Sequence, residues 1–496
     1  MPHEQVLVID AGTTGIRALV IDRNSREVGR AYTEFPQYHP GPGRVEQNAE
    51  EIWQATRLVV RRTLEETGLA AADIAAIGIT NQRATTVVWD RATGDAVAPA
   101  IVWQDTRTAA LADELRPEWG DRVYARTGWT LAPVYSSLSL RWLLDNHSGA
   151  RDRAQAGELA FGTIDSWLIH KLTGGRVHAI SASNASVTGS YDLVTDGWHE
   201  EWLAALGLPL SLFPEVRDDS GDLGHTDADA VGAEIPIASA VADQQSALFA
   251  EHCWEPGEVK STHGTGTFLD MNVGPEPVIS SSGLSSLIAW RIDGETTYAL
   301  EGYAAVTGAA IQWLRDGAEL VQSADETEAL ARSVKDNGGV YFVPALTGLS
   351  APYWDANARG TIFGISPSTK RAHLVRATLE GIVYSMRDFL DTMAIDAGHP
   401  IRTIRADGGA SRNDFLLEFQ ADVLGVEVVR PANIEATALG AAYLAGLAVG
   451  LWETREDCFV GIEADRTFTP TMSSDERKRL YSNWQRAIER SRGWLE

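Results

Sequence analysis

Two segments of the chain, about half its length apart, share one pattern: a strand, a turn rich in glycine and threonine, and a second strand. The first covers residues 6–21 with its turn over 10–15, and the second covers 258–273 with its turn over 263–267. Recurrence of one unit is typical of a duplicated domain. Hairpins with such turns are also common by themselves, so the residues leave duplication and coincidence as open alternatives.

The rest of the chain alternates between patterns typical of strands and patterns typical of helices. Apolar residues have helical spacing over 50–67 and 373–393, and a strand pattern over 235–240 closes the first half. Such alternation favours α/β layers built on mixed sheets. The length of 496 residues allows about three average domains or two large ones. We therefore expect two α/β domains, over residues 1–250 and 251–496.

The chain is strongly acidic. It has 42 Lys and Arg residues against 68 Asp and Glu residues, which gives a net charge of −26 at pH 7. Proteins that bind nucleic acid or anionic membrane surfaces need a basic face, so we expect neither kind of partner. A ligand that carries phosphate is repelled by the overall field and therefore needs local donors or a metal ion.

Cysteine content and hydropathy indicate the compartment. The two cysteines, Cys253 and Cys458, cannot build a disulfide framework or a four-thiolate zinc site. The first residues lack the basic and apolar regions of a targeting signal, and no apolar run reaches about 18 residues. We expect a cytoplasmic protein without a membrane-spanning helix.

Several common catalytic fingerprints are absent from the chain. It has no Gly-Lys dipeptide and hence no P-loop, and it has no Gly-x-Gly-x-x-Gly motif. It also lacks the Gly-x-Ser-x-Gly elbow of hydrolases and the His-Glu-x-x-His motif of zinc proteases. These absences argue against P-loop nucleotidases, dinucleotide oxidoreductases and those two classes of hydrolase.

Glycine-rich turns stand at the ends of three predicted strands, over residues 10–15, 264–266 and 407–409. In the first turn, the backbone amides and the hydroxyls of Thr13 and Thr14 suit phosphate oxygens, and Arg17 adds a local positive charge. Asp10 could hold Mg²⁺ through water. A plain hairpin turn is the alternative for each turn taken alone. Three such turns in one chain favour nucleotide binding.

Asp243 is the sharpest single candidate for a catalytic group. It follows the predicted strand 235–240 and opens a helix, and α/β proteins place active sites at such strand ends. The alternative is an aspartate that only caps its helix, although Gln244 directly after it is less expected of a plain cap. Arg83 and Trp103 are further candidates, and their alternatives are a solvated loop and a core position.

Several motifs then follow one another along the chain in a characteristic order. They are Ile-Asp-Ala-Gly-Thr-Thr over 9–14, Gly-Ile-Thr-Asn-Gln-Arg over 78–83, Ala-Asp-Gln-Gln over 242–245, Gly-Thr-Gly over 264–266, and a longer pattern over 360–365 and 373–380. Together they resemble the FGGY carbohydrate kinases, and within that family they are most similar to its glycerol kinase branch. The resemblance runs from about residue 6 to residue 452.

The resemblance implies two actin-like ATPase domains with ribonuclease-H-like cores and a cleft between them. The first domain would lie on the substrate side and the second on the nucleotide side. ATP would be the phosphoryl donor, and Mg²⁺ would be positioned by Asp10 and Asp243. Asp243 would also be the general base on the acceptor hydroxyl. The implied ATP contacts are Asp10, Thr13, Thr14, Arg17, Thr265, Gly308, Gln312, Gly409 and Asn413.

The implied acceptor site matches the glycerol kinase branch only in part. That branch holds its acceptor with an Arg-Glu pair, a Trp, a Tyr, an Asp-Gln pair and a Phe. The matching residues here are Arg83, Trp103, Asp243, Gln244 and Phe268. The Glu position is occupied by Ala84, and the Tyr position by Val134, with Tyr135 one place later.

These departures leave more than one acceptor as an alternative. A site built around a substrate hydroxyl binds less well when one polar partner is lost. We therefore expect an ATP-dependent kinase that acts on glycerol, or on a larger C4–C6 polyol or ketose that fills the vacated space. An actin-like ATPase switch is the less favoured alternative, because a switch needs no small polar pocket. The resemblance is also compatible with a homo-oligomer, either a dimer or a tetramer.

Overall fold

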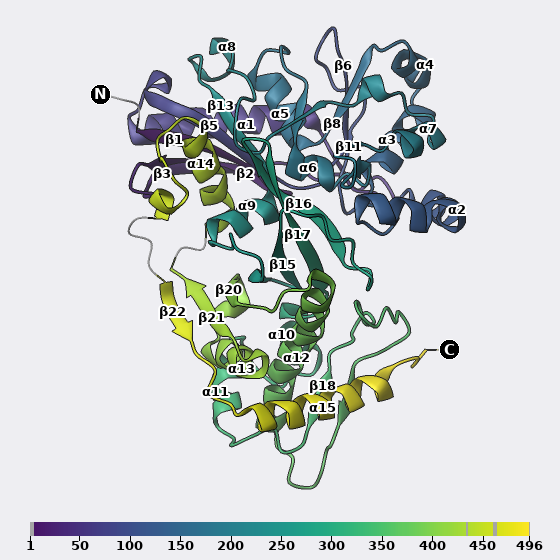
Figure 1. Cartoon of the computed structure of the whole chain (residues 1–496), viewed down its shortest axis with the longest axis vertical. Coiled ribbons are helices and arrows are strands. Elements are labelled where there is room, and N and C mark those ends of the chain that lie inside the picture. Colours follow the sequence, from purple (N-terminus) through teal and green to yellow (C-terminus); the bar gives the residue numbers. More distant parts are fainter. Residues whose placement is uncertain (1–3, 433–434, 460–463, 496) are drawn as a thin grey trace.

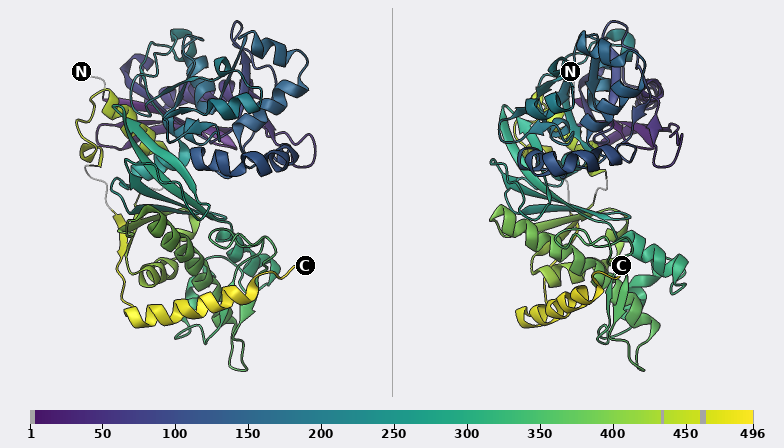
Figure 2. Two further views of the ribbon diagram at one scale, coloured as in Figure 1. Left: turned by 45° about the vertical axis from the view of Figure 1, so that its right-hand side comes forward. Right: turned by 90° about the vertical axis from the view of Figure 1, so that its right-hand side faces the viewer.

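The fold was analysed in a computed structural model, which describes residues 4–432, 435–459 and 464–495. The chain forms two lobes, one above the other, with the first half of the sequence in the upper lobe and most of the second half in the lower lobe (Figure 1). The C-terminal helix α15 (Ser474–Ser491) lies at the lower end of the molecule in both views of Figure 2.

Each lobe is built around one twisted sheet. The first sheet has the strand order β13-β5-β1-β2-β3. Its strands are β1 (Gln5–Ala11), β2 (Gly15–Asp22), β3 (Glu27–Glu34), β5 (Ile74–Asn81) and β13 (Ile237–Ala242). The second sheet has the order β16-β17-β15-β14-β20-β21-β22. Its strands are β14 (Glu258–His263), β15 (Thr267–Gly274), β16 (Ser285–Ile292), β17 (Glu295–Ala304), β20 (Thr403–Asp407), β21 (Glu427–Pro431) and β22 (Ala464–Phe468).

The two sheets share one plan. In the first, β1 pairs antiparallel with β2, β2 pairs antiparallel with β3, and β1, β5 and β13 run parallel. In the second, β14, β15, β17, β20 and β21 repeat the same order and the same directions. The duplication that the two hairpins left open is therefore confirmed, and the two glycine-threonine turns occupy equivalent places in the two sheets.

Helices cover the sheets because each presents an apolar face. On the first sheet, α1 (Ala49–Thr67) and α5 (Ile164–Leu172) belong to one buried cluster with β1 and β2. Asn48 caps α1 by accepting the amide hydrogen of Glu50 at 2.9 Å. On the second sheet, α12 (Arg371–Ala397), α13 (Asp414–Leu424) and α15 share the main core of the lower lobe.

One helix from the second half of the chain lies in the upper lobe. Although α14 (Ala436–Ala448) comes late in the chain, it packs beside α9 (Asp243–Ala250) and against β1, β5 and β13 of the first sheet, and Figure 1 shows it in the upper lobe. Gly78 permits this packing, because a Cβ there would lie 2.5 Å from the carbonyl oxygen of Ala441. The upper lobe therefore includes a helix from the second half of the chain. The division into two domains at residue 250 stays a prediction.

The remaining elements lie mostly at the periphery of the sheets. In the upper lobe they are β4 (Glu46–Gln47), β6 (Val87–Asp90), β7 (Ala100–Ile101), α2 (Ala109–Thr127), α3 (Ser136–Asn146), α4 (Ala150–Gln155), β8 (Leu159–Gly162), β9 (Ala179–Ser181), α6 (Ala182–Ser186), β10 (Tyr191–Asp192), β11 (Gly197–Trp198), α7 (Glu200–Ala205), β12 (Glu215–Arg217) and α8 (Ala228–Val231). In the lower lobe they are α10 (Gly308–Gln312), α11 (Glu326–Arg332), β18 (Tyr341–Val343) and β19 (Thr361–Phe363). Within the described residues, no helix combines the length and the apolar character needed to cross a membrane.

Candidate active site

Two aspartates reach one cavity from neighbouring strand ends. Asp10 lies near the end of β1, and Asp243 begins α9 directly after β13. Because β1, β5 and β13 run parallel, their carboxyl ends meet at one edge of the sheet. Asp10 and Asp243 line a cavity of about 450 Å³ together with Thr14, Arg17 and Gln244. The fold thus brings these five predicted site residues together.

The two carboxyl groups repel each other. Burial raises the pKa of Asp10, a hydrogen bond from Arg17 Nε at 2.7 Å opposes that rise, and the charge of Asp243 adds to it. Burial likewise raises the pKa of Asp243, and the guanidinium of Arg83 opposes the rise. A divalent cation beside two such carboxylates would relieve the repulsion, and Mg²⁺ commonly takes one or two carboxylates together with waters and phosphates.

The donor set therefore fits Mg²⁺ bound with a nucleotide better than a cation held by protein alone. Among the residues that the structure describes, no group of three or more His, Cys, Asp or Glu side chains could hold a metal ion. Two carboxylates beside a turn with two threonine hydroxyls leave the remaining ligand positions of the cation to waters and phosphate oxygens.

The first glycine-threonine turn is held by side chains that lie outside it. Arg17 pairs with Asp10 and also with Glu435, so its guanidinium is held at the cavity wall. The indole Nε1 of Trp103 donates to Thr13 Oγ1 at 3.1 Å. A predicted acceptor residue, Trp103, is thereby in contact with a predicted nucleotide residue, Thr13. The Trp103 side chain is 40% exposed, which leaves ring surface for a ligand.

The second turn, 264–266, is fixed against the start of α10. The Gly308 amide donates to the carbonyl oxygen of Gly264 at 3.0 Å, and the carbonyl oxygen of Thr265 accepts two amide hydrogens from the segment around Gly308. A Cβ on Gly308 would lie 2.6 Å from the Gly264 oxygen, so this approach requires glycine. Gln312 ends α10 and is exposed.

The third turn follows β20 and approaches the second. Gly408 has φ +85°, and a Cβ there would lie 2.6 Å from the carbonyl oxygen of His263. Gly409 lines a cavity of about 550 Å³ that shares Thr437 with the cavity around Asp10. Asn413 caps the N-terminus of α13. Gly409 therefore lines a cavity that adjoins the cavity around the two aspartates, whereas Asn413 lines neither cavity.

Arg83 connects the acceptor residues of both lobes. Its Nη1 donates to Glu301 Oε2 at 2.6 Å, and its Nε lies 3.4 Å from Asp243 Oδ1. Its guanidinium carbon lies 5.9 Å from the centre of the Phe268 ring. Sequence reasoning missed Glu301, which stands mid-strand in β17 without a motif. Burial raises the pKa of Glu301 to about 7, Arg83 opposes that rise, and nearby Asp270 adds to it.

The orientation of Gln244 is set by a buried lysine that the sequence also did not reveal. Lys260 Nζ donates to Gln244 Oε1 at 2.6 Å and to Asp270 Oδ2 at 2.8 Å, and Lys260 is fully buried. Because the amide oxygen of Gln244 is occupied, its NH₂ group is the one left for a ligand. A lysine and an aspartate on neighbouring buried strands are the only sequence signal that could have indicated this pair.

The two positions that depart from the glycerol kinase pattern lie close together. Ser136 Oγ donates to the carbonyl oxygen of Ala84 at 3.0 Å, which brings the segment of Val134 beside Ala84. Tyr135 points away from the site. It is fully buried in the cluster around α3, and its hydroxyl donates to the carbonyl oxygen of Trp129. The structure therefore places Tyr135 in the core instead of the predicted acceptor site.

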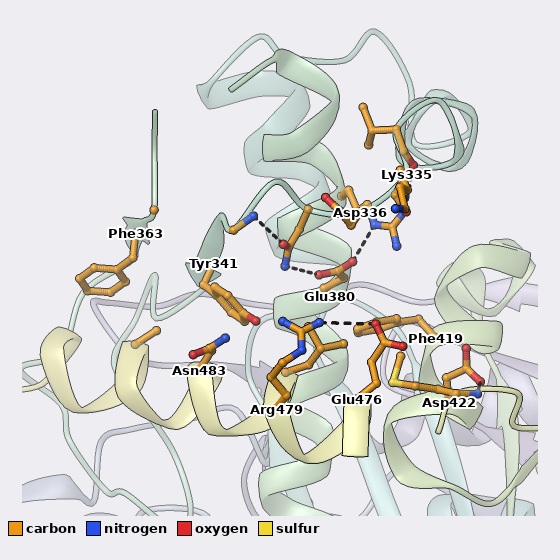
Figure 3. A pocket seen from close by; sticks show the side chains of 18 of the residues that line it. Lys335, Asp336, Tyr341, Phe363, Glu380, Phe419, Asp422, Glu476, Arg479 and Asn483 are labelled. Atoms are coloured by element: carbon orange, nitrogen blue, oxygen red, sulfur yellow. Dashed lines mark hydrogen bonds and ion pairs between the residues drawn. The ribbon is translucent and has the colours of Figure 1, made fainter. Parts of the chain in front are cut away.

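Two larger cavities contain none of the predicted site residues. One of about 1050 Å³ lies between α1 and α8, and one of about 860 Å³ lies between α12, α13 and α15 in the lower lobe (Figure 3). Two pairs of charged side chains in the second cavity neutralise each other, since Arg376 pairs with Glu380 at 2.7 Å and Arg479 with Glu476 at 3.5 Å. The cavity around Asp10 and Asp243 is therefore the candidate active site.

Comparison with known protein families identifies the family of the chain. Residues 5–250 match the N-terminal domain of the FGGY family of carbohydrate kinases, and residues 259–449 match its C-terminal domain. The chain belongs to this family. It is therefore an ATP-dependent carbohydrate or polyol kinase, and the resemblance inferred from the motifs is confirmed. The alternative of an actin-like ATPase switch is not supported.

Individual relatives cover the whole chain. A protein named glycerol kinase from Petrotoga mobilis is 50% identical over 495 residues, which is 100% of this chain and 99% of that protein. A protein named glycerol kinase 2 from Thermotoga maritima is 50% identical over 490 residues, 99% of each chain. The structure of Plasmodium falciparum glycerol kinase with ADP superposes with a TM-score of 0.94 at 31% identity and covers 98% of each chain. The expected two-domain, actin-like fold is thus confirmed.

Proposed function

We propose that this kinase transfers the γ-phosphoryl group of ATP to a hydroxyl of a small polyol, with glycerol as the first candidate and glycerol 3-phosphate as its product. The observation that carries the proposal is that Arg83 lies next to both Asp243 and Phe268. A cation, a carboxylate and an aromatic ring are thereby grouped around one side chain. Full-length similarity to proteins named glycerol kinase supports glycerol.

A second candidate acceptor is a C4–C6 polyol or ketose. The side chains of Ala84 and Val134 are short, they offer no hydrogen bond, and their segments lie side by side. A longer acceptor could occupy that space, whereas glycerol would leave it without a polar partner. The same catalytic groups would serve either acceptor.

In the proposed reaction, Asp243 accepts the proton of the acceptor hydroxyl while the hydroxyl oxygen attacks the γ-phosphorus of ATP, and ADP leaves with the electron pair of the broken bond. Burial suits Asp243 to this role, because it moves the pKa of a carboxyl group towards neutral pH. Arg83 and the amide NH₂ of Gln244 would orient the acceptor. Positioning and charge neutralisation account for most of the catalysis of phosphoryl transfer.

The three glycine-rich turns would hold the phosphates of ATP. Thr13, Thr14 and Arg17 would contact them from the upper lobe, and Thr265, Gly308, Gln312, Gly409 and Asn413 would contact the nucleotide from the lower lobe. Asp10 and Asp243 would hold Mg²⁺, which supplies charge neutralisation when it is bound. We also infer a cytoplasmic enzyme, and a homo-oligomer is compatible with the family; both remain predictions.

The test is an ADP-release assay with and without glycerol, erythritol, xylitol and D-xylulose. The products are identified by phosphorus NMR, which distinguishes a phosphate monoester from inorganic phosphate. We expect ADP release to depend on a polyol and to yield its monophosphate. ADP release that yields only inorganic phosphate, whatever polyol is present, would contradict the proposal.

A further inference from the structure

A tyrosine on β17 lies beside the proposed acceptor site and has no role in the reaction proposed above. Tyr303 pairs in register with Phe268 on β15, and the centres of the two rings lie 4.6 Å apart. The side chain of Tyr303 is 43% exposed, which is high for a ring in the middle of a molecule. Its hydroxyl forms no hydrogen bond with any residue that the structure describes.

The direction of the Tyr303 side chain follows from the strand. Side chains two residues apart on a strand lie on the same face, so Tyr303 faces the same way as Glu301. Glu301 contacts Arg83, which in turn lies next to the general base Asp243. Tyr303 therefore lies on the face of the sheet from which Arg83 approaches, one residue pair further towards the second turn.

The position of the hydroxyl is fixed more closely by Gly266. A Cβ on Gly266 would lie 2.7 Å from the Tyr303 hydroxyl oxygen. The phenol thus covers the last residue of the 264–266 turn. Its ring contacts Phe268, a proposed acceptor residue, and its hydroxyl lies over Gly266, the neighbour of Thr265 in the chain.

The duplicated plan of the two sheets indicates which ligand the phenol serves. Tyr32 on β3 stands at the equivalent place in the first sheet, and its hydroxyl oxygen would lie 2.5 Å from a Cβ on Gly15. Tyr32 is paired in register with Arg17, a charged residue of the nucleotide cavity. Tyr303 is paired with apolar Phe268 instead. An apolar wall with one phenol suits the carbon chain and a hydroxyl of a polyol better than a phosphate.

We propose that Tyr303 is a specificity-determining residue whose hydroxyl hydrogen-bonds a hydroxyl of the acceptor, while its ring and the Phe268 ring form one wall of the acceptor site. This inference rests on the proposed function, since it requires a polyol acceptor. It also gives the acceptor a phenolic partner from the lower lobe, so the acceptor is held from both lobes at once.

The test uses Tyr303→Phe, which keeps the ring and removes only the hydroxyl. The matched control is Tyr298→Phe, on the same strand five residues away, where the side chain is 7% exposed. Steady-state kinetics are measured for glycerol, propane-1,2-diol and propane-1,3-diol at saturating ATP, and for ATP at saturating glycerol. A lost neutral hydrogen bond predicts a decrease of about three- to tenfold in kcat/KM for glycerol in Tyr303→Phe.

The two diols locate the contact. One of the two diols lacks the hydroxyl that Tyr303 contacts in glycerol. The ratio of kcat/KM for glycerol to kcat/KM for that diol should therefore fall by a similar factor in Tyr303→Phe. This ratio is measured on one preparation and does not depend on the fraction of folded enzyme. The KM for ATP should stay within twofold, and Tyr298→Phe should behave like the wild type.

Two outcomes would overturn the inference while the proposed function stands. One is an active wild type whose diol preferences are unchanged in Tyr303→Phe, and the other is a rise in the KM for ATP alone, which would assign the phenol to the nucleotide. A wild type that phosphorylates none of the polyols would overturn the proposed function and this inference together.

Discussion

Arg83 and Glu301 form an ion pair of 2.6 Å that joins the two lobes, because Arg83 follows β5 of the first sheet and Glu301 lies on β17 of the second. The same guanidinium lies 3.4 Å from the proposed base, Asp243. Glu301 therefore decides how Arg83 is shared between the two carboxylates, and its ionisation should be visible in the pH dependence of the reaction.

Glu301→Gln tests this relationship. Burial raises the pKa of Glu301 to about 7, so the group is mostly protonated at pH 6 and mostly ionised at pH 8. Only the ionised form pairs fully with Arg83, so we expect wild-type kcat/KM for the acceptor to rise between these values. In Glu301→Gln that rise should be smaller, because only the ionisation of Asp243 remains to produce it, and kcat/KM at pH 8 should fall by about tenfold, or ~1.4 kcal/mol. An unchanged pH profile in the variant would contradict this account.

The effect of Glu301 on folding stability has the opposite sign. A carboxyl group whose pKa is raised on folding stabilises the fold when it is protonated. That contribution is fully present below the unfolded pKa, near 4.5, and is lost as the pH rises through about 7. Urea unfolding at pH 5 and pH 8 should therefore show a smaller loss of stability with pH in Glu301→Gln than in the wild type.

Asp243→Asn should abolish phosphoryl transfer and leave ATP binding largely intact. The amide cannot accept the proton of the acceptor hydroxyl, and general-base catalysis is worth about 10²–10⁴-fold in kcat. Calorimetric titration with ATP measures the binding that remains. Asp229→Asn, an acidic position on the surface helix α8, is the matched control for the loss of one charge. Retention of more than about a tenth of wild-type kcat would remove Asp243 from the role of base.

The sequence predicted those parts of the site that local patterns determine. Asp10 and Asp243 could be placed because each follows a buried strand run, and parallel strands bring their carboxyl ends together. Long elements were likewise predictable, since the helix expected over 373–393 appears as Arg371–Ala397. The duplication became certain only when strand pairing showed the same order in both sheets.

Contacts between distant strands could not be predicted from the sequence. Glu301 meets Arg83 across 218 positions, and its importance depends on a register that no local pattern reveals. Lys260 is fully buried although lysine is usually exposed, because Asp270 lies in the neighbouring strand. Tyr135 shows another limit, since the residue pattern around position 134 did not reveal that the Tyr135 side chain is buried in the core.

Gly308→Ala should weaken ATP binding through the second turn. The added methyl group would lie 2.6 Å from the carbonyl oxygen of Gly264, so the turn or the start of α10 must move. We expect the KM for ATP to rise by about tenfold, which is ~1.4 kcal/mol, and the KM for the acceptor to change much less. Gly197→Ala is the control, because nothing lies within 4 Å of a Cβ at that position. Equal effects on both KM values would mean that the turn does not act on the nucleotide alone.

Ala84→Glu combined with Val134→Tyr tests whether the two departures set the choice of acceptor. Glutamate would add a charged hydrogen-bond acceptor next to Arg83, and tyrosine would add a phenol and fill space. Each recovered hydrogen bond is worth about 0.5–1.5 kcal/mol, and the effects need not add because the two segments lie side by side. We expect kcat/KM for glycerol to rise at least tenfold, or ~1.4 kcal/mol of transition-state binding. Activity on erythritol, xylitol or D-xylulose should fall, because the added volume excludes longer chains.

The measurement is steady-state kinetics on all four acceptors for both proteins, with each single variant as a control for its own half of the change. If the wild type already uses glycerol as well as any other acceptor and the double variant gains nothing, Ala84 and Val134 do not determine specificity. Glycerol would then be the acceptor in spite of these two departures.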